Sequence, residues 1–364
     1  MKTALIYGEF IPKSSTGIAY VNSMLETCLK KLGYEVTTIE QPRAKDYAKS
    51  LDKIVRKNFN IIEYIKLLNK LFKIDINDIS FITISMGNLG LLKTLIIQSF
   101  LNIRSRRLYL YIHRGDLYIQ YKSSIYKRIL INLIIKKSFK VIFLSEIFKK
   151  KGIIKNLEQK TLVIPNSLNY DDSKISKKAF KNSIYFKKEN AKVLKLLFCS
   201  NIQKGKGIKN IIKAVNIFNR KLLDYQIQLD IYGMRFEDII KENKYIKYKG
   251  KLKTNERLSV MSKYDCLILA SLTEGLPITL IECLSMGILF ITTKVGAIDD
   301  LLVKDYPYIC EHDIKSLINT LENFIKDFRH NKKLIDEIKF KNHDLFNKKY
   351  SYKHFEKNIK KFIY

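Results

Sequence analysis

The sequence predicts an α/β protein made of two successive doubly wound domains that face each other across a cleft. Three observations predict this fold class. The chain has 364 residues, more than a single hydrophobic core usually serves. Its hydrophobic content of 46% is enough for two cores. Short apolar runs alternate with helical patterns through both halves, as in parallel sheets covered by helices on both faces.

The first half opens with one strand–helix–strand unit. Residues 3–7 and 35–39 have strand patterns, and residues 18–31 between them carry apolar side chains at helical spacing. The right-handed crossover that such a unit makes implies parallel strands. Further strands are expected at residues 108–112, 141–144 and 161–164. The first domain is accordingly predicted to span residues 1–168.

The second half repeats this order, so that two Rossmann-like units follow one another. We expect the interdomain connection in the polar, weakly periodic stretch 169–192, and the second domain over residues 169–345. Its predicted strands are residues 194–199, 227–232, 246–248, 266–270 and 289–292, and its predicted helices include 208–218 and 278–286. The end of the chain, residues 346–364, is expected to be helical and to pack back on the first domain.

The composition favours an anionic partner inside the cell. The formal charge is +32, from 67 basic and 35 acidic residues, although abundant Lys and Asn also suit AT-rich coding. No signal-peptide pattern follows Met1 and no apolar run reaches the length of a membrane span. The five cysteines are dispersed, as expected for reduced core thiols. We therefore expect a cytoplasmic protein, with peripheral attachment to an anionic membrane surface as a subsidiary hypothesis.

Two segments mix basic and apolar residues in a way that suits a membrane surface, namely 122–140 and the cluster 149–151. An ordinary amphipathic helix that packs on the core explains the first segment equally well. Vesicle binding that salt reverses would distinguish the two interpretations.

The stretch ASLTEGLPITLIECLSMGILFITTKVG, residues 270–296, is the most informative in the chain. A buried strand ends near Ala270, and a loop with Glu274 leads into a helix that carries Glu282. The helix start therefore lies at the carboxyl end of a parallel strand, where open α/β sheets bind ligands and where helix amides suit a diphosphate. We expect a nucleotide diphosphate to be bound at this helix start, by Gly275, Leu276, Pro277, Ile278 and Thr279. Taken singly, each glutamate is more often an ordinary solvated residue.

The joint pattern resembles the retaining glycosyltransferases of family 4, which have the GT-B fold. It consists of Glu-x7-Glu within a Ser-x-x-Glu-Gly-x-Pro segment and, earlier in the chain, of Lys206 and Gly207 at a helix start. Pro165 with Asn166 matches the usual end of the family's first domain. The resemblance covers most of the chain and is strongest over residues 195–300.

The resemblance implies roles for individual residues. Glu274 would contact hydroxyls of the donor sugar, Glu282 the nucleotide ribose, and Lys206 the diphosphate leaving group. Asn201 stands where many members carry a second diphosphate cation. His113, which ends a predicted strand, would orient the donor sugar near its anomeric carbon, although a lone His is more often structural.

The loop Ser15, Thr16 and Gly17 would lie near the donor phosphates or the acceptor, although Thr16 is also an ordinary helix cap. The resemblance further implies metal independence, and no strand-terminal Asp-x-Asp pair is evident. No cofactor is expected. The expected substrates are a nucleotide-sugar, with a UDP-sugar favoured, and a glycan acceptor. We expect this acceptor to be a lipid-linked oligosaccharide used in cell-surface polysaccharide synthesis.

Two rival functions remain open on the residues alone. Gly205 and Gly207 after a strand suggest an NAD(P)-dependent oxidoreductase, but the third glycine of that fingerprint is missing. The charge suggests a nucleic-acid-binding protein, but the basic residues are spread along the chain without a recognition motif, so no specific nucleic acid is expected.

Overall fold

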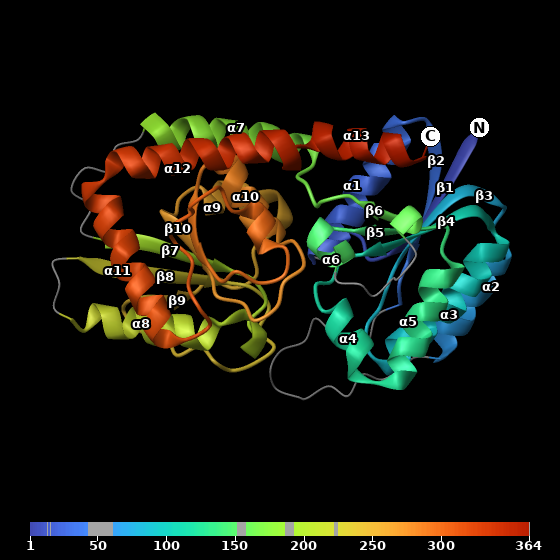
Figure 1. Ribbon diagram of the computed structural model, residues 1–364, viewed down its shortest axis with the longest axis horizontal. Helices are drawn as coiled ribbons and strands as arrows, with labels where there is room; N and C mark the ends of the chain where they lie inside the picture. Colours follow the sequence, from blue (N-terminus) through green and yellow to red (C-terminus); the bar gives the residue numbers. More distant parts are fainter. Residues whose placement is uncertain are drawn as a thin grey trace. The chain divides into compact units, whose positions relative to one another are not determined.

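The computed structural model describes residues 1–12, 14, 16–42, 61–150, 158–185, 193–221 and 225–363. The chain forms two compact units (Figure 1). The first contains Met1–Asn166 together with Phe355–Tyr364, and the second contains Ser167–His354. Each unit is built around one sheet in which every strand pairing is parallel.

The sheet of the first unit has the strand order β2-β1-β3-β4-β5-β6. Its strands are β1 Lys2–Gly8, β2 Tyr34–Glu40, β3 Asn77–Thr83, β4 Ser105–Ile112, β5 Lys140–Phe143 and β6 Thr161–Val163. The chain moves from β1 to β2 in one direction and then returns past β1 to β3 and beyond. The order therefore reverses between β1 and β3, which makes the carboxyl ends of these strands the natural binding edge.

Helices cover both faces of this sheet. They are α1 Gly17–Lys31, α2 Ile61–Phe72, α3 Asn88–Ile103, α4 Leu117–Ser123, α5 Ile125–Lys137, α6 Glu146–Lys150 and α13 Tyr352–Ile363, with a short 3₁₀ turn η1 Glu158–Lys160. The helices α2, α3 and α5 lie side by side, with α3 in contact with both neighbours (Figure 1). The last helix, α13, buries Phe355, Ile359 and Ile363 at a spacing of four residues.

The second unit has the strand order β11-β10-β7-β8-β9. Its strands are β7 Val193–Cys199, β8 Gln226–Tyr232, β9 Ile246–Tyr248, β10 Cys266–Leu269 and β11 Leu289–Thr292. Its helices are α7 Tyr170–Tyr185, α8 Ile208–Asn219, α9 Arg257–Met261, α10 Ile278–Met286, α11 Ile314–His330 and α12 Lys332–Leu345. Shorter helical turns are η2 Lys204–Lys206, η3 Thr254–Glu256, η4 Ile298–Leu301 and the π turn η5 Phe346–Tyr350. Here the strand order reverses between β7 and β10.

Part of the stretch in which we expected the interdomain connection is helical. Residues 170–185 form the helix α7 within the second unit, and residues 186–192 lie outside the described residues. The Asn169 side chain caps this helix by accepting a hydrogen bond from the Asp172 amide over 2.7 Å. Its Phe180 ring stacks on His343 with centroids 3.8 Å apart. Contacts with distant helices, among them α10 and the Phe340 ring, thus hold a stretch whose own periodicity is weak.

The chain end also differs from the expected boundary. Residues 346–354 stay with the second unit, where Ser167 donates a hydrogen bond of 2.6 Å to the Tyr350 carbonyl oxygen. Only the part from Phe355 onward groups with the first unit. There the Tyr109 hydroxyl and the Arg107 guanidinium donate to carbonyl oxygens at the end of α13, each over 3.1 Å. None of the described helices is long and apolar enough to cross a membrane.

Candidate functional site

A lysine and a carboxylate meet at the point of the second sheet where the strand order reverses. Lys206 lies in η2, just after β7, and Glu274 lies in the loop after β10. The lysine Nζ is 2.6 Å from the Glu274 Oε1, although the two residues are 68 positions apart. Both side chains are largely buried, with 19% of Lys206 and 8% of Glu274 exposed. The pair therefore marks the edge where sheets of this topology bind ligands.

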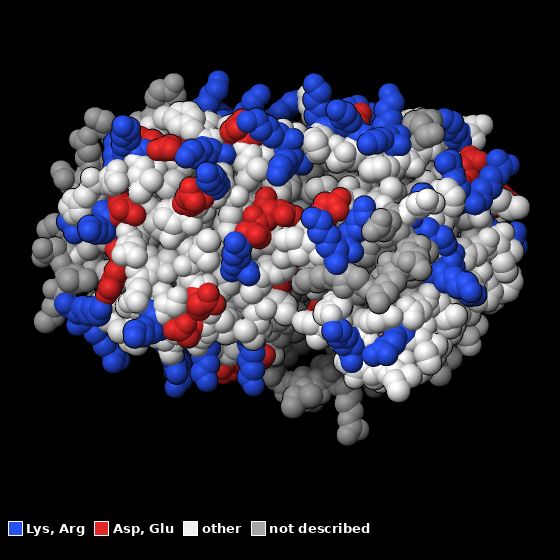
Figure 2. Space-filling model, in the orientation of Figure 1, with Lys and Arg blue, Asp and Glu red and all other residues white. Residues whose placement is uncertain are grey.

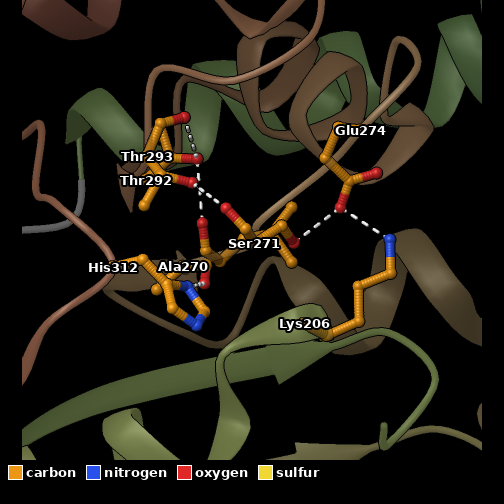
Figure 3. Close-up of polar contacts among 8 residues, drawn as sticks. Lys206, Ala270, Ser271, Glu274, Thr292, Thr293 and His312 are labelled. Atoms are coloured by element: carbon orange, nitrogen blue, oxygen red, sulfur yellow. Dashed lines mark hydrogen bonds and ion pairs between the residues drawn. The ribbon is translucent and has the colours of Figure 1, made fainter. Parts of the chain in front are cut away.

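The Glu274 carboxylate is held in place by the strands around it (Figure 3). The Ser271 hydroxyl donates a hydrogen bond of 2.7 Å to the same Oε1 atom. The Thr293 hydroxyl in turn donates to the Ser271 carbonyl oxygen over 2.6 Å. The second oxygen of Glu274 carries none of the contacts drawn in Figure 3, so it is the one left for the hydroxyl of a ligand.

Two glycines allow the loops of this edge to approach each other. Gly207, which begins α8, has φ +73°, and a Cβ atom there would lie 2.0 Å from the Ala270 carbonyl oxygen. Gly296, after β11, has φ +62°, and a Cβ atom there would lie 1.9 Å from the Glu274 carbonyl oxygen. Both positions favour glycine for their backbone conformation and for their lack of space. The Leu272 amide completes the junction by donating to the Gly205 carbonyl oxygen over 2.9 Å.

The structure places the segment that was expected to hold the donor directly beside this pair. Residues 275–277 connect Glu274 to α10, and Pro277 stands at the N-cap of that helix. Ile278 and Thr279 are its first two residues, so the first-turn amides begin four positions after the carboxylate. Amides at such a helix start attract anions. The geometry is suited to a diphosphate next to Lys206.

Glu282 occupies a different environment from Glu274. It lies in α10, is fully buried, and its Oε1 accepts a charged hydrogen bond from the Arg257 Nε atom. The Arg257 guanidinium also lies 3.9 Å from the Asp172 carboxylate, so residues from α9, α10 and α7 form one buried ionic cluster. Burial raises the pKa of Glu282 to about 7 against the opposing attraction of Arg257. Its Oε2 has no hydrogen-bond partner among the described residues.

Arg257 was missed by the sequence reasoning. It stands 25 positions before Glu282 and has no motif of its own, so its contact with Glu282 follows only from the fold, in which α9 packs on α7. Burial raises the pKa of Cys199, at the end of β7, and the nearby Glu282 raises it further while Arg257 lowers it. The cluster therefore lies near the carboxyl end of β7.

Asn201 lies in the loop between β7 and η2, at the same sheet edge. A cation that the sequence reasoning also missed lies close by. Arg235, in the loop after β8, pairs through its backbone with Ile202, the residue next to Asn201. Its guanidinium lies 5.2 Å from the centre of the Tyr248 ring and bonds to Asp238. The sequence did contain a signal for Arg235: a glycine and an arginine directly follow the predicted strand that becomes β8, and β8 ends at this edge.

His113 belongs to the first unit, where it follows β4. Its ring stacks on Tyr111 with centroids 4.1 Å apart. Both ring nitrogens are buried, and neither has a hydrogen-bond partner among the described residues. Burial lowers the pKa of His113 to about 3, so the imidazole is neutral at physiological pH. A buried imidazole without partners favours a ligand-binding role over a purely structural one.

The loop after β1 is organised by a carboxylate that the sequence reasoning did not consider. The Glu9 Oε2 atom accepts hydrogen bonds from the Ser14 hydroxyl over 2.8 Å and from the Thr16 hydroxyl over 2.7 Å. Thr16 also caps α1 by accepting from the Ala19 amide, and Gly17 is the first residue of the helix. Ser15 lies outside the described residues. The loop thus presents a carboxylate and hydroxyls where the strand order of the first sheet reverses.

The described part of the chain contains no group of three or more His, Cys, Asp or Glu residues arranged to hold a metal ion. Its five cysteines are all free, and four of them are buried. Metal independence remains a prediction.

The second unit matches a known protein family. Residues 180–340 match the family model described as "Glycosyl transferases group 1", which covers most of that unit. The sequence matches no curated protein.

Solved structures resemble the whole chain. Sucrose-phosphate synthase from Thermosynechococcus elongatus has a TM-score of 0.71 at 13% identity, covering 99% of this chain and 98% of that one. The Anabaena protein HepE in complex with UDP and glucose has a TM-score of 0.66 at 14% identity, covering 98% of each chain. The catalytic domain of Arabidopsis thaliana starch synthase IV, bound to ADP and acarbose, has a TM-score of 0.65 at 12% identity, covering 96% of this chain and 99% of that one. This chain has the GT-B fold of these structures.

Proposed function

We propose that this protein is a retaining glycosyltransferase of family 4 that transfers a sugar from a nucleotide-diphosphate sugar to a glycan acceptor. One observation carries the proposal: the Lys206–Glu274 contact of 2.6 Å beside the start of α10, where the strand order reverses. The family match over residues 180–340 supports it. We infer a UDP-sugar as the donor, because the HepE complex holds UDP.

The proposed chemistry assigns the site residues as follows. Negative charge grows on the departing phosphate oxygen, so Lys206 and the first amides of α10 bind the transition state more tightly than the ground state. Glu274 accepts hydrogen bonds from hydroxyls of the donor sugar. No metal ion is required, since these groups neutralise the diphosphate.

Two further residues act at the edges of the donor. Glu282 accepts hydrogen bonds from the ribose hydroxyls through Oε2, the atom that has no other partner among the described residues. His113 stays neutral and donates one ring N–H to the sugar near its anomeric carbon. Its low pKa supports this role, because an imidazole with a pKa of about 3 keeps one N–H without carrying charge.

The proposed acceptor is a lipid-linked oligosaccharide used in cell-surface polysaccharide synthesis. The hydroxyl-rich loop at Thr16 and Gly17 supports it, because the loop gathers hydroxyls and the Glu9 carboxylate, the kinds of group that recognise sugar hydroxyls, at the end of β1. An acceptor of this kind places the enzyme at the cytoplasmic face of a membrane.

Nucleotide release from a panel of UDP-, GDP- and ADP-sugars tests the proposal. Lys206→Met and Glu274→Gln are compared with Lys213→Met and Glu256→Gln, which change the same residue types at exposed positions. We expect release from one donor, lowered by about 10²–10³ in kcat for the two site variants and unchanged in the controls. Wild-type rates in Lys206→Met would contradict the assignment. If no donor is turned over, protection against heat by UDP separates a missing acceptor from a wrong family, and protection by NADH alone would favour the oxidoreductase.

A further inference from the structure

The outer surface of the helical layer α2, α3 and α5 is unusually apolar. On the central helix α3, the residues that face away from the sheet are Leu89, Leu92, Ile96 and Ile103, which we call the apolar stripe. All four are exposed, Leu89 by 65% and Ile103 by 70%. Their spacing places them on one side of the helix, while Leu91, Ile97 and Leu101 on the opposite side are buried. Lys93 is the only charged residue in α3, and it lies over the Tyr64 ring.

The flanking helices extend this surface. The exposed side of α5 carries Ile125, Ile129 and Leu133 at a spacing of four residues, and the exposed side of α2 carries Ile62 and Ile65. Among the described residues, 14 of the exposed large hydrophobic side chains lie between residues 62 and 139 and seven lie in the second unit. An exposed apolar area of this extent marks an interaction site. In segment 122–140, one side of α5 packs on the core, as the amphipathic interpretation predicted, and the other side is exposed.

Basic side chains border the apolar stripe. Residues 61–140 contain 14 Lys and Arg but only four Asp and Glu. The Lys137 ammonium reaches across from α5 to donate to the Ser99 hydroxyl of α3 over 3.1 Å. Figure 2 shows a broad uncharged area where α2 and α3 lie in Figure 1, with Lys and Arg at its margins, including the side of α5. An apolar centre with a basic margin matches an anionic bilayer, which offers acyl chains below a negatively charged surface.

We propose that this outer surface, the apolar stripe with its neighbours on α2 and α5, docks the protein on an anionic lipid bilayer. The positive charge around this surface decides between two possible partners, a second copy of the chain and an anionic bilayer. A second copy of the chain would bring Lys and Arg of one margin against those of the other, which like-charge repulsion disfavours. Anionic head groups neutralise the same margins, at about 1 kcal/mol for each Lys or Arg near the surface. The inference goes beyond the proposed function, which depends on the site in the second unit.

Sedimentation with vesicles tests the proposal. The full chain is mixed with vesicles of phosphatidylcholine alone, or with about one third phosphatidylglycerol, at low and at high salt. We expect binding to the anionic vesicles only, weakened as salt rises. Leu89→Ser with Ile96→Ser should lower the partition coefficient about tenfold, because less apolar area enters the interface. Ile175→Ser with Ile217→Ser, exposed apolar residues of the second unit, is the matched control and should bind as the wild type does.

A charge series tests the basic margin separately. Arg128→Gln, Lys136→Gln and Lys137→Gln together should lower binding to anionic vesicles at least about tenfold. The control replaces Lys304, Lys315 and Lys326, three exposed lysines of the second unit, by Gln. Equal losses in both sets would overturn the proposal by showing that net charge alone drives binding. Absence of vesicle binding, or a dimer in solution that the Leu89→Ser with Ile96→Ser variant abolishes, would overturn it as well. Nucleotide release without vesicles reports on the proposed function independently.

Discussion

The buried cluster around Glu282 makes a quantitative prediction about pH. Replacing Arg257 by Met removes the cation that touches Glu282 and leaves a fully buried carboxyl group. The pKa of Glu282 is about 7 in the wild type, raised by burial in spite of Arg257, and the variant must raise it further. A carboxyl group whose folded-state pKa exceeds its unfolded value stabilises the fold at low pH, and this contribution disappears as pH rises through the folded pKa.

The difference between the folded-state and unfolded-state pKa of Glu282 sets how the stability of each protein depends on pH. In the wild type, this contribution is complete below about pH 4.5 and gone above about pH 7. In Arg257→Met the Glu282 carboxyl group stays protonated to higher pH. The free energy of unfolding of the variant therefore continues to fall as pH rises above 7, where that of the wild type no longer changes through this group. The gap between variant and wild type should therefore widen by about 1.4 kcal/mol for each pH unit above 7. Near pH 6, Glu282 is mostly neutral in both, and the gap should shrink to the lost hydrogen bond of about 1 kcal/mol.

Urea unfolding at pH 6, 7.5 and 9 measures this gap. Arg257→Lys keeps a positive charge and should reduce the pH dependence, and Arg257→Met combined with Glu282→Gln should abolish it. A gap that stays constant from pH 6 to 9 would refute the reasoning, since Glu282 would then not be the group that titrates. A double variant as pH-dependent as the single one would refute it too.

Three other predictions follow from the same structure. Gly207→Ala should weaken binding of the donor nucleotide, measured by calorimetry, and lower stability by more than about 2 kcal/mol, measured by urea unfolding. The reason is that a Cβ atom there would lie 2.0 Å from the Ala270 carbonyl oxygen. A Cβ atom at Gly205 meets open space, so Gly205→Ala should behave as wild type. Dialysis against EDTA should leave nucleotide release unchanged, and reversible loss restored by Mg²⁺ or Mn²⁺ would argue for a bound metal. Phe355→Ala should cost about 3–5 kcal/mol of stability because Phe355 is buried against the first unit, while Lys353→Ala at an exposed position should cost less than about 0.5 kcal/mol.

The sequence predicted the fold class because its strands are short, apolar and regularly spaced. The strands expected at residues 246–248 and 289–292 and the helix at 278–286 coincide with β9, β11 and α10, and the other predicted strands and the helix at 208–218 differ from the observed ones by one residue at an end. The strand β3 was missed. It begins with Asn77 and Asp78, which obscure the apolar run that follows, and the apolar α3 after it offers no clear periodicity in the sequence.

The candidate site was only partly accessible to sequence reasoning. Lys206 and Glu274 were singled out through a family resemblance, but their contact depends on β10 lying next to β7, and strand order cannot be read from strand positions. Glu9 was overlooked because its importance lies in two hydroxyl contacts made by a loop. Arg257 could not be found because the penalty of burying Glu282 becomes visible only once the packing is known.

The helix α13 also bears on how the protein is made. The first unit takes the part of α13 that begins at Phe355, while its sheet is encoded within residues 1–166. A ribosome therefore releases the strands of this unit well before the helix that covers Tyr109 has been synthesised. The second unit is contiguous in sequence, so it can finish folding first even though translation reaches it later. A released chain truncated after His354 should consequently leave the first unit open to proteases or chaperones and the second unit largely protected.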